Sequence, residues 1–380
     1  MTGFAGSPAG KLAAATGIAL LLTLAAPANA AAPVTDCPLR DRPFTADSPL
    51  IDVLLNPVAK AALVNEGKLN LSRLPPIFGT TPPSFAAILS VREAVGFFGQ
   101  NTEVIAPVDA ALRRIPVTAT DRRLRCARYD NERPRFALPA GKPRLLLFEK
   151  INGFKDTPSV DAAHAALLAM ADRKGWAMAV TDKGGAFNPA TLRQFDAVIW
   201  NNISGDVLTL AQRRAMQRYV EGGGAFIALH GSAGDPVYFW DWYADTLIGA
   251  RFAGHPMNPQ FQEARVVLDA AAPDAIAQGL PKEWRMTDEW YSFRTNPRAA
   301  GARVIATLDE STYTQVGHAG QQLTMGDHPI AWTKCVGRGR MFYSAIGHRP
   351  ETYSHPVNVT LMERGMDWAL TAAACSPHGR

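Results

Sequence analysis

The feature that most constrains the fold is a series of short apolar segments separated by helical ones between residues 144 and 230. Four segments are almost continuously apolar: RLLLFEK (144–150), WAMAVTD (176–182), FDAVIWNN (195–202) and AFIALH (225–230). Helical patterns over 158–175 and 209–224 lie between them. Apolar strands connected by helices are typical of a parallel sheet covered on both faces. We therefore predict an α/β domain with a doubly wound, mostly parallel sheet.

The later part of the chain is richer in predicted strands. They cover 261–269, 284–293, 302–309, 328–335 and 340–348. The last two are separated by Gly337-Arg338-Gly339, so we expect them to form a hairpin. A helix over 357–373 is expected to close the domain.

The first thirty residues have the pattern of a secretory signal peptide. Lys11 precedes an apolar run from Leu12 to Pro27, and Ala28-Asn29-Ala30 follows. The run is shorter than the ~20 residues of a membrane-spanning helix. We therefore expect residues 1–30 to be removed and the mature protein to be secreted or periplasmic, without a membrane span.

Residues 31–142 differ in character from the α/β region. They are rich in proline, and the segments 48–67 and 82–99 carry helical periodicity. We expect a helical N-terminal extension and linker here, followed by the α/β domain at 143–375. The extension contains no recognisable chemistry, and no pattern fixes the number of subunits.

The charge pattern argues against a nucleic-acid partner. The formal charge is +5, from 39 basic and 34 acidic residues spread along the chain. One short basic cluster contains Arg122, Arg123, Arg125 and Arg128, and no nucleic-acid motif accompanies it. We expect this cluster to be a solvated linker.

Four cysteines indicate two disulfides in an oxidising compartment, for which three pairings exist. We favour Cys37 with Cys126 and Cys335 with Cys375. The chain has no CxxC motif, so a zinc site made of thiolates is not expected.

Histidines stand at the ends of two apolar strands. His230 ends AFIALH and His348 ends RMFYSAIGH, and ligands of open parallel sheets bind beyond the carboxyl ends of strands. One such histidine is more often structural, but two favour a shared site. His255 and His355 lie beside prolines in loops, where a surface position fits equally well. If three or four of them met, neutral imidazoles would suit zinc or manganese; the metal stays open.

Acidic and aromatic candidates lie in TDEWYSF (287–293). Asp288 and Glu289 are adjacent, so on a strand they point to opposite faces, which argues against the two carboxylates of an ordinary glycosidase. One of them is a candidate base or a group that orients a histidine. Tyr291 and Tyr353 suit either contact with a sugar or an ordinary core.

The glycines at 222–224 end a helix and precede a strand. A phosphate loop needs the reverse order, so we do not expect one.

Four ordered segments resemble the ThuA-like family, named for trehalose utilisation: RYVEGGGAFIALHGSAG, IGARFAGHP, TDEWYSF and GRGRMFYSAIGH. The resemblance runs from about residue 144 to 374. It implies a flavodoxin-like core akin to the class I glutamine amidotransferase fold, and a link to sugar metabolism that includes 3-keto disaccharides. In amidotransferase relatives the corresponding strand leads to a nucleophilic cysteine. Here His230 and Gly231 stand there, which excludes glutamine hydrolysis by a thiolate.

One segment departs from the family pattern. Relatives carry a sequence like GFRH after the first strand, whereas this chain reads GFKD, so Asp156 stands in place of a histidine. A carboxylate is still able to bind a metal or a substrate.

Together these features predict an exported enzyme that acts on a saccharide or 3-keto-glycoside by isomerisation, elimination or hydrolysis. We expect His230, Glu289 and His348 to be catalytic. Substrate contacts are expected from His255, Asp288, Tyr291, Tyr353, His355 and Asp156. Two alternatives remain: a noncatalytic sugar-binding protein, and a metal-dependent hydrolase of another small molecule.

Overall fold

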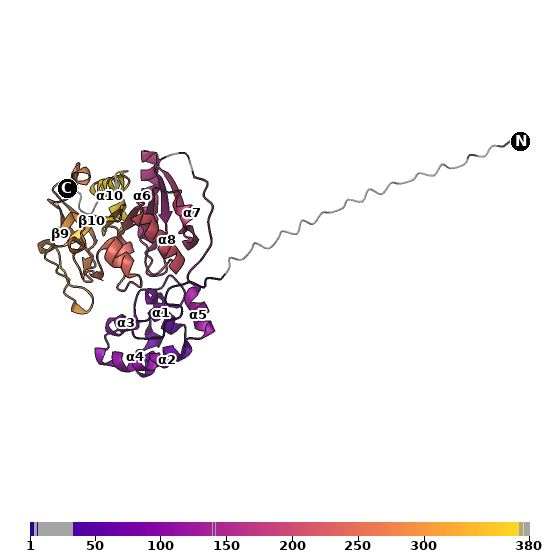
Figure 1. Cartoon of the computed structure of the whole chain (residues 1–380), viewed down its shortest axis with the longest axis horizontal. Helices are drawn as coiled ribbons and strands as arrows, with labels where there is room; N and C mark the ends of the chain where they lie inside the picture. Colours follow the sequence, from indigo (N-terminus) through magenta and orange to yellow (C-terminus); the bar gives the residue numbers. More distant parts are fainter. Residues whose placement is uncertain (4–5, 7–32, 139, 141, 372–374, 376–380) are drawn as a thin grey trace. The chain divides into compact units, whose positions relative to one another are not determined.

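The computed structural model describes residues 1–3, 6, 33–138, 140, 142–371 and 375 (Figure 1). The chain divides into two units, Met1–Ala32 and Pro33–Arg380. The predicted signal peptide lies almost wholly outside the described residues. A search of the described helices found none that is both long and apolar enough to cross a bilayer.

One large sheet forms the core of the second unit. Five strands pair in parallel: β1 (Arg144–Phe148), β2 (Ala177–Thr181), β3 (Ala197–Asn201), β4 (Ala225–Leu229) and β11 (Gly339–Ser344). Four more continue the sheet with antiparallel pairing: β6 (Phe261–Leu268), β7 (Glu283–Glu289), β9 (Arg303–Asp309) and β10 (Pro329–Val336). The order is β2-β1-β3-β4-β11-β10-β9-β6-β7. The predicted α/β class is confirmed, and the sheet joins a parallel half to an antiparallel half.

Three helices contact the strands of this sheet: α6 (Thr157–Lys174), α8 (Leu210–Glu221) and α10 (Pro356–Ala369) (Figure 1). Two short helices pack on them, α7 (Pro189–Leu192) on α8 and α9 (Asp274–Ala277) on α10. α8 begins with the capping box that Thr209 and Gln212 form. β10 and β11 form the expected hairpin, and the predicted final helix is α10. A short second sheet pairs β5 (Phe252–Gly254) with β8 (Ser292–Phe293).

The register between β4 and β11 positions the candidate site. Leu229 is the partner of Ser344, the last residue of β11, and the two strands are parallel. Because parallel strands end at the same edge of a sheet, the segments that follow Leu229 and Ser344 emerge together.

The described residues 33–138, which precede β1, contain helices and no strand of either sheet. Their α-helices are α1 (Leu50–Leu54), α2 (Pro57–Asn65), α3 (Val91–Phe97), α4 (Ile105–Arg113) and α5 (Ala119–Cys126). The first four share an apolar cluster of their own, which includes Phe44, Leu63 and Val108. We refer to the described residues 33–138 as the helical extension.

Both favoured disulfides are present. Cys37 is bonded to Cys126 in the helical extension, and Cys335 is bonded to Cys375. Such bonds are consistent with an oxidising compartment outside the cytoplasm.

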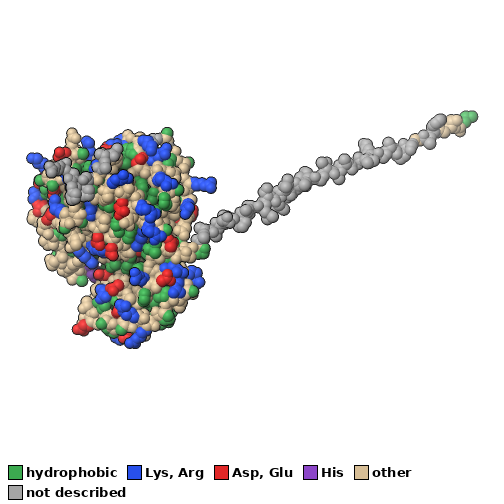
Figure 2. All heavy atoms as spheres, viewed as in Figure 1, with side chains coloured by type: hydrophobic (Ala, Val, Ile, Leu, Met, Phe, Trp, Pro, Cys, Tyr) green, Lys and Arg blue, Asp and Glu red, His purple; other side chains and the backbone are tan. Residues whose placement is uncertain are grey.

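The expectation of a solvated basic linker is wrong for two of its arginines. Arg125 is 2% exposed and donates hydrogen bonds to the carbonyls of Leu39 and Arg42. Arg128 is also buried, with its Nη1 2.6 Å from Asp52 Oδ1. A buried guanidinium needs a charge partner and hydrogen-bond acceptors. Because these partners come from segments far away in the sequence, the two arginines hold the extension together. On the face that Figure 2 shows, basic and acidic side chains are interspersed.

Candidate functional site

Three strands bring the predicted catalytic residues together. His230 follows β4 and begins a single 3-10 turn, η6 (His230–Ala233), with a φ of 32°. Glu289 is the last residue of β7, and His348 lies in the loop after β11. A positive φ is uncommon outside glycine and often occurs at functional sites.

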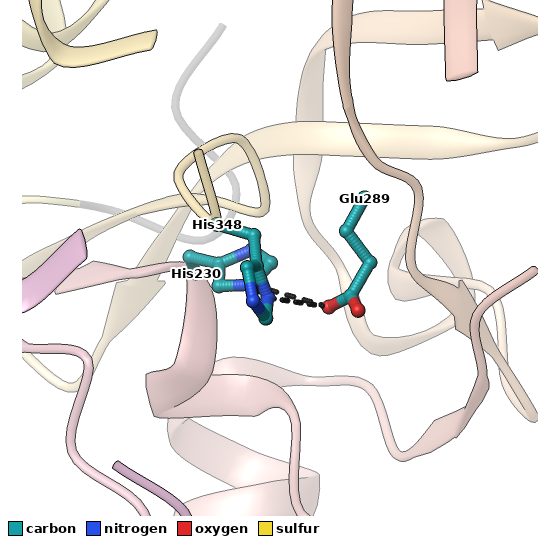
Figure 3. A group of neighbouring side chains, drawn as sticks. All are labelled: His230, Glu289 and His348. Carbon is teal, nitrogen blue, oxygen red and sulfur yellow. Dashed lines mark hydrogen bonds and ion pairs between the residues drawn. The ribbon is translucent and has the colours of Figure 1, made fainter. Parts of the chain in front are cut away.

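The two imidazoles converge on one carboxylate (Figure 3). Glu289 Oε2 lies 2.9 Å from His348 Nδ1 and 3.5 Å from His230 Nε2. The two ring nitrogens are themselves 3.3 Å apart. Glu289 is only 2% exposed, so this charge is held away from bulk water. We call these three residues the His–Glu–His cluster.

The hydrogen bond that His230 makes through Nδ1 fixes the tautomer of its neutral form. Nδ1 lies 2.6 Å from the Ala345 carbonyl oxygen, which only accepts hydrogen bonds, so Nδ1 carries the hydrogen. The lone pair of neutral His230 is therefore on Nε2, which faces the cluster. Tyr291 stacks on the His230 ring with 4.1 Å between centroids and restricts its rotation.

The other oxygen of Glu289 has partners as well. His255 Nδ1 lies 3.2 Å from Glu289 Oε1, and Gln260 donates a hydrogen bond to the same oxygen through Nε2. Three imidazoles and one amide thus surround a single buried carboxylate.

These contacts set the charge states. Burial would raise the pKa of Glu289, but the neighbouring imidazoles of His230 and His348, the latter through the Nδ1–H that it donates, outweigh it and hold that pKa well below its usual value. Burial would lower the pKa of His348, but the hydrogen bond and the charge of Glu289 raise it above its usual value. The favoured state pairs an ionised Glu289 with a protonated His348.

Asp288 precedes Glu289 in β7 and holds the loop that carries His348. Its carboxylate accepts hydrogen bonds from the backbone N–H groups of Gly347, His348 and Arg349 at 2.6, 3.1 and 2.9 Å. Asp288 is fully buried, which raises its pKa. Gly347 has a φ of 149°, and a Cβ at this position would collide with the Tyr353 hydroxyl. The loop can therefore pack closely only with glycine here.

The cluster opens into a cavity of about 750 Å³, which is within the size range of small-molecule sites. His230, His255, Glu289, Tyr291 and His348 all line it, as does Asp156. The cavity extends to residues of the helical extension, among them Phe85 and Phe97.

Three further residues that are predicted to contact the substrate, Asp156, Tyr353 and His355, lie outside the His–Glu–His cluster. Asp156 caps α6 by accepting a hydrogen bond from Ser159 N. The Ser159 hydroxyl lies within hydrogen-bonding distance of two acceptors, the Asp156 carboxylate and the His348 carbonyl oxygen. Tyr353 accepts a hydrogen bond from Asn202 Nδ2 at 3.0 Å. His355 precedes α10, and its buried Nδ1 has no hydrogen-bond partner among the described residues. The residues that line the cavity include neither Tyr353 nor His355.

Some cavity residues were missed by sequence reasoning. Asn202 follows β3 at the same edge as His230, and its Oδ1 accepts a hydrogen bond from Gly231 N at 3.1 Å. Asp235 lies close by, bonded by Ser204 Oγ and Gly205 N. The strand-end rule that selected His230 applies equally to Asn202. No comparable signal marked Phe85 or Phe97, because apolar rings in a helical segment resemble core residues.

The His–Glu–His cluster also has the donor set of a divalent metal site. Its three donor atoms all lie within 4.8 Å of one another. Two imidazoles and one carboxylate suit zinc, manganese or iron, whose bonds of ~2.0–2.2 Å place neighbouring donors about 3 Å apart. The bond from His230 Nδ1 to a backbone carbonyl is the support that metal-bound histidines usually have. The residues therefore fit such an ion.

Comparisons with known proteins agree with this fold. The ThuA family, described as trehalose utilisation, matches residues 144–369, which is more than half of the chain. A solved ThuA-like structure from Bacteroides uniformis is 21% identical with a TM-score of 0.52, covering 64% of this chain and 97% of that one. A second, from Parabacteroides merdae, is 17% identical with a TM-score of 0.45, covering 61% and 91%. A comparison with curated proteins found no match. The resemblance predicted from four sequence segments is thus confirmed, and this chain belongs to the ThuA family.

Proposed function

We propose that this protein is an exported enzyme that acts on a keto-sugar or its glycoside by proton transfer at the His–Glu–His cluster. The observation that carries the proposal is the meeting of His230, Glu289 and His348 at one end of a ligand-sized cavity. Membership of a family described as trehalose utilisation supports a saccharide. The two disulfides support export. The strand order β2-β1-β3-β4-β11 supports a flavodoxin-like, doubly wound parallel half.

The chemistry follows from the charge states. A sugar carbonyl makes the neighbouring C–H acidic, and neutral His230 presents the Nε2 lone pair that accepts this proton. The nearby Glu289 carboxylate stabilises the imidazolium that forms. Protonated His348 donates Nδ1–H to Glu289, which leaves Nε2–H for the oxygen of the developing enolate. The enolate next to the anomeric carbon expels the aglycone by elimination, and the departing oxygen takes the proton that His230 has accepted. Alternatively, the enolate takes up a proton from water on the opposite face to give an isomer, and His230 releases its proton to solvent.

A metal-dependent hydrolase is the second candidate function. The same three donors fit a divalent ion, as described above. A bound ion would polarise a carbonyl or activate water, and His255 would remain to bind substrate.

Turnover of 3-keto trehalose and 3-keto cellobiose, followed by NMR, tests the leading proposal. We expect the wild type to convert at least one of them and the double variant His230→Ala/His348→Ala to convert neither. The matched control is His164→Ala, because His164 pairs with Glu149 and is not among the residues that line the cavity. Undiminished turnover by the double variant would refute the proposal.

A further inference from the structure

The cavity runs from the His–Glu–His cluster to an apolar wall on the helical extension. Phe85, Ile88, Phe97 and Ile105 line this part. All four precede the segment 144–369 that matches the family. These four residues therefore lie outside the segment that matches the family, whereas Phe154, which lies between them and the cluster, is inside that segment.

Aromatic rings connect the wall to the cluster. The Phe97 and Phe85 centroids are 5.7 Å apart, and Phe85 lies 6.2 Å from Phe154. Phe154 lies in turn 6.2 Å from the His348 ring. The His318 ring stacks on Phe97 at 4.7 Å with an interplanar angle of 4°. We call Phe85, Phe97 and Phe154 the aromatic wall.

The charged side chains beside this wall form ion pairs, one of them longer than a hydrogen bond. Arg92 Nε lies 2.8 Å from Asp47 Oδ1, and Glu93 pairs with Arg294 at 3.8 Å. A second sugar ring would bury several hydroxyl groups, each of which needs a hydrogen-bond partner. The three phenyl rings of the aromatic wall offer none, so the group that contacts these rings is favoured to be apolar.

We propose that the substrate is a glycoside with a flat aromatic aglycone, which lies against the aromatic wall while the sugar lies at the His–Glu–His cluster. The inference rests on the proposed function, because it assigns the sugar to that cluster. Edge and face contacts with three rings favour a planar group over a flexible chain. The cavity of about 750 Å³ has room for both parts.

Calorimetric titration of the whole mature protein tests this inference without requiring turnover. The probes are the α and β anomers of phenyl and methyl glucopyranoside. Cellobiose serves as the probe that carries a second sugar in place of the phenyl group. We expect one phenyl anomer to bind at least tenfold more tightly than the matching methyl glucoside and than cellobiose.

Variants assign the preference to the wall. Phe97→Ala removes a ring, and Phe154→Leu keeps an apolar side chain but removes the aromatic face; each should reduce the phenyl preference at least threefold. Phe98→Ala is the matched control, because Phe98 neighbours Phe97 but is not among the residues that line the cavity. Circular dichroism checks that each variant folds.

Four results would overturn the inference: no measurable binding of either phenyl anomer, equal affinity for phenyl and methyl glucosides, tighter binding of cellobiose, or a phenyl preference that survives both wall substitutions. Failure of the proposed function is distinguishable. In that case phenyl glucosides bind as expected, but no keto-sugar is converted.

Discussion

His348 Nδ1 lies 2.9 Å from Glu289 Oε2, although 59 positions separate the two residues in the chain. The contact joins the end of an antiparallel strand to the loop after a parallel one. It pairs an imidazole whose pKa is raised with a carboxylate whose pKa is lowered, and His230 Nε2 lies 3.5 Å from the same carboxylate oxygen.

Replacing His230 by asparagine should abolish most of the activity. Asparagine retains a polar group of similar reach but cannot accept the substrate proton, and general base catalysis contributes roughly 10²–10⁴-fold. We expect kcat to fall at least 100-fold on the keto-sugar substrate, measured by product formation. His164→Asn should retain wild-type kcat, and a similar loss in both variants would point to a general defect instead.

Divalent metal should stabilise the folded protein if the second candidate function holds. A ligand that binds only the native state adds about 2.7 kcal/mol at 100 times its Kd. Zinc or manganese should then raise the Tm of chelator-treated wild type but not that of Glu289→Gln. Equal Tm values with and without either metal, together with full activity after chelation, would eliminate the metal-dependent hydrolase.

Removing the Asp288 carboxylate should displace the His348 loop. Asp288→Ala leaves three backbone N–H groups without their acceptor, each at a cost of about 1–3 kcal/mol. Urea unfolding should show a loss of several kcal/mol, and kcat should fall more than KM rises. Asp288→Asn should recover part of the stability and part of kcat, because one acceptor oxygen remains. A variant with lower stability but unchanged kcat would show that Asp288 does not position His348.

Stability should decrease with rising pH because of Asp235. Burial raises the pKa of this carboxyl to about 7, whereas an unfolded aspartate has a pKa of about 3.9. The folded state therefore binds more protons between these values, so its advantage is complete below pH ~4 and is lost as pH rises to ~7. A shift of this size corresponds to about 4 kcal/mol.

The measurement is the free energy of unfolding in urea at several pH values between 4 and 8. Asp235→Asn cannot ionise, so its stability should fall much less over this range than that of the wild type. Parallel curves for the two proteins would contradict the raised pKa of Asp235.

Much of the site could be predicted because strand ends are visible in the sequence. The two apolar runs end at His230 and His348 in the sequence. The strands end earlier, at Leu229 and Ser344, and parallel pairing places the residues after them at one edge. His230 and His348 were found in this way. The favoured cysteine pairs place one bond in the helical extension and one near the C-terminus, and both bonds are present. Adjacent residues on a strand point to opposite faces, which anticipated the separate surroundings of Asp288 and Glu289.

Other features depend on contacts that local patterns do not encode. The antiparallel half of the sheet required the long-range pairing of β6 with β7 and β9. Arg125 and Arg128 looked like surface charges because their buried partners, the carbonyls of the 39–42 segment and Asp52, lie far away in the chain. The role of the helical extension in lining the cavity was missed, since Phe85 and Phe97 have the same pattern as core residues.

Hydrogen exchange at the sugar carbon next to the carbonyl tests the central claim most directly. With a 3-keto disaccharide in D₂O, the wild type should introduce deuterium at that carbon, seen by NMR as loss of the proton signal, and His230→Asn should slow this exchange at least 100-fold. Exchange at the same rate in both proteins, or turnover by the wild type without any loss of that proton, would contradict proton transfer by His230.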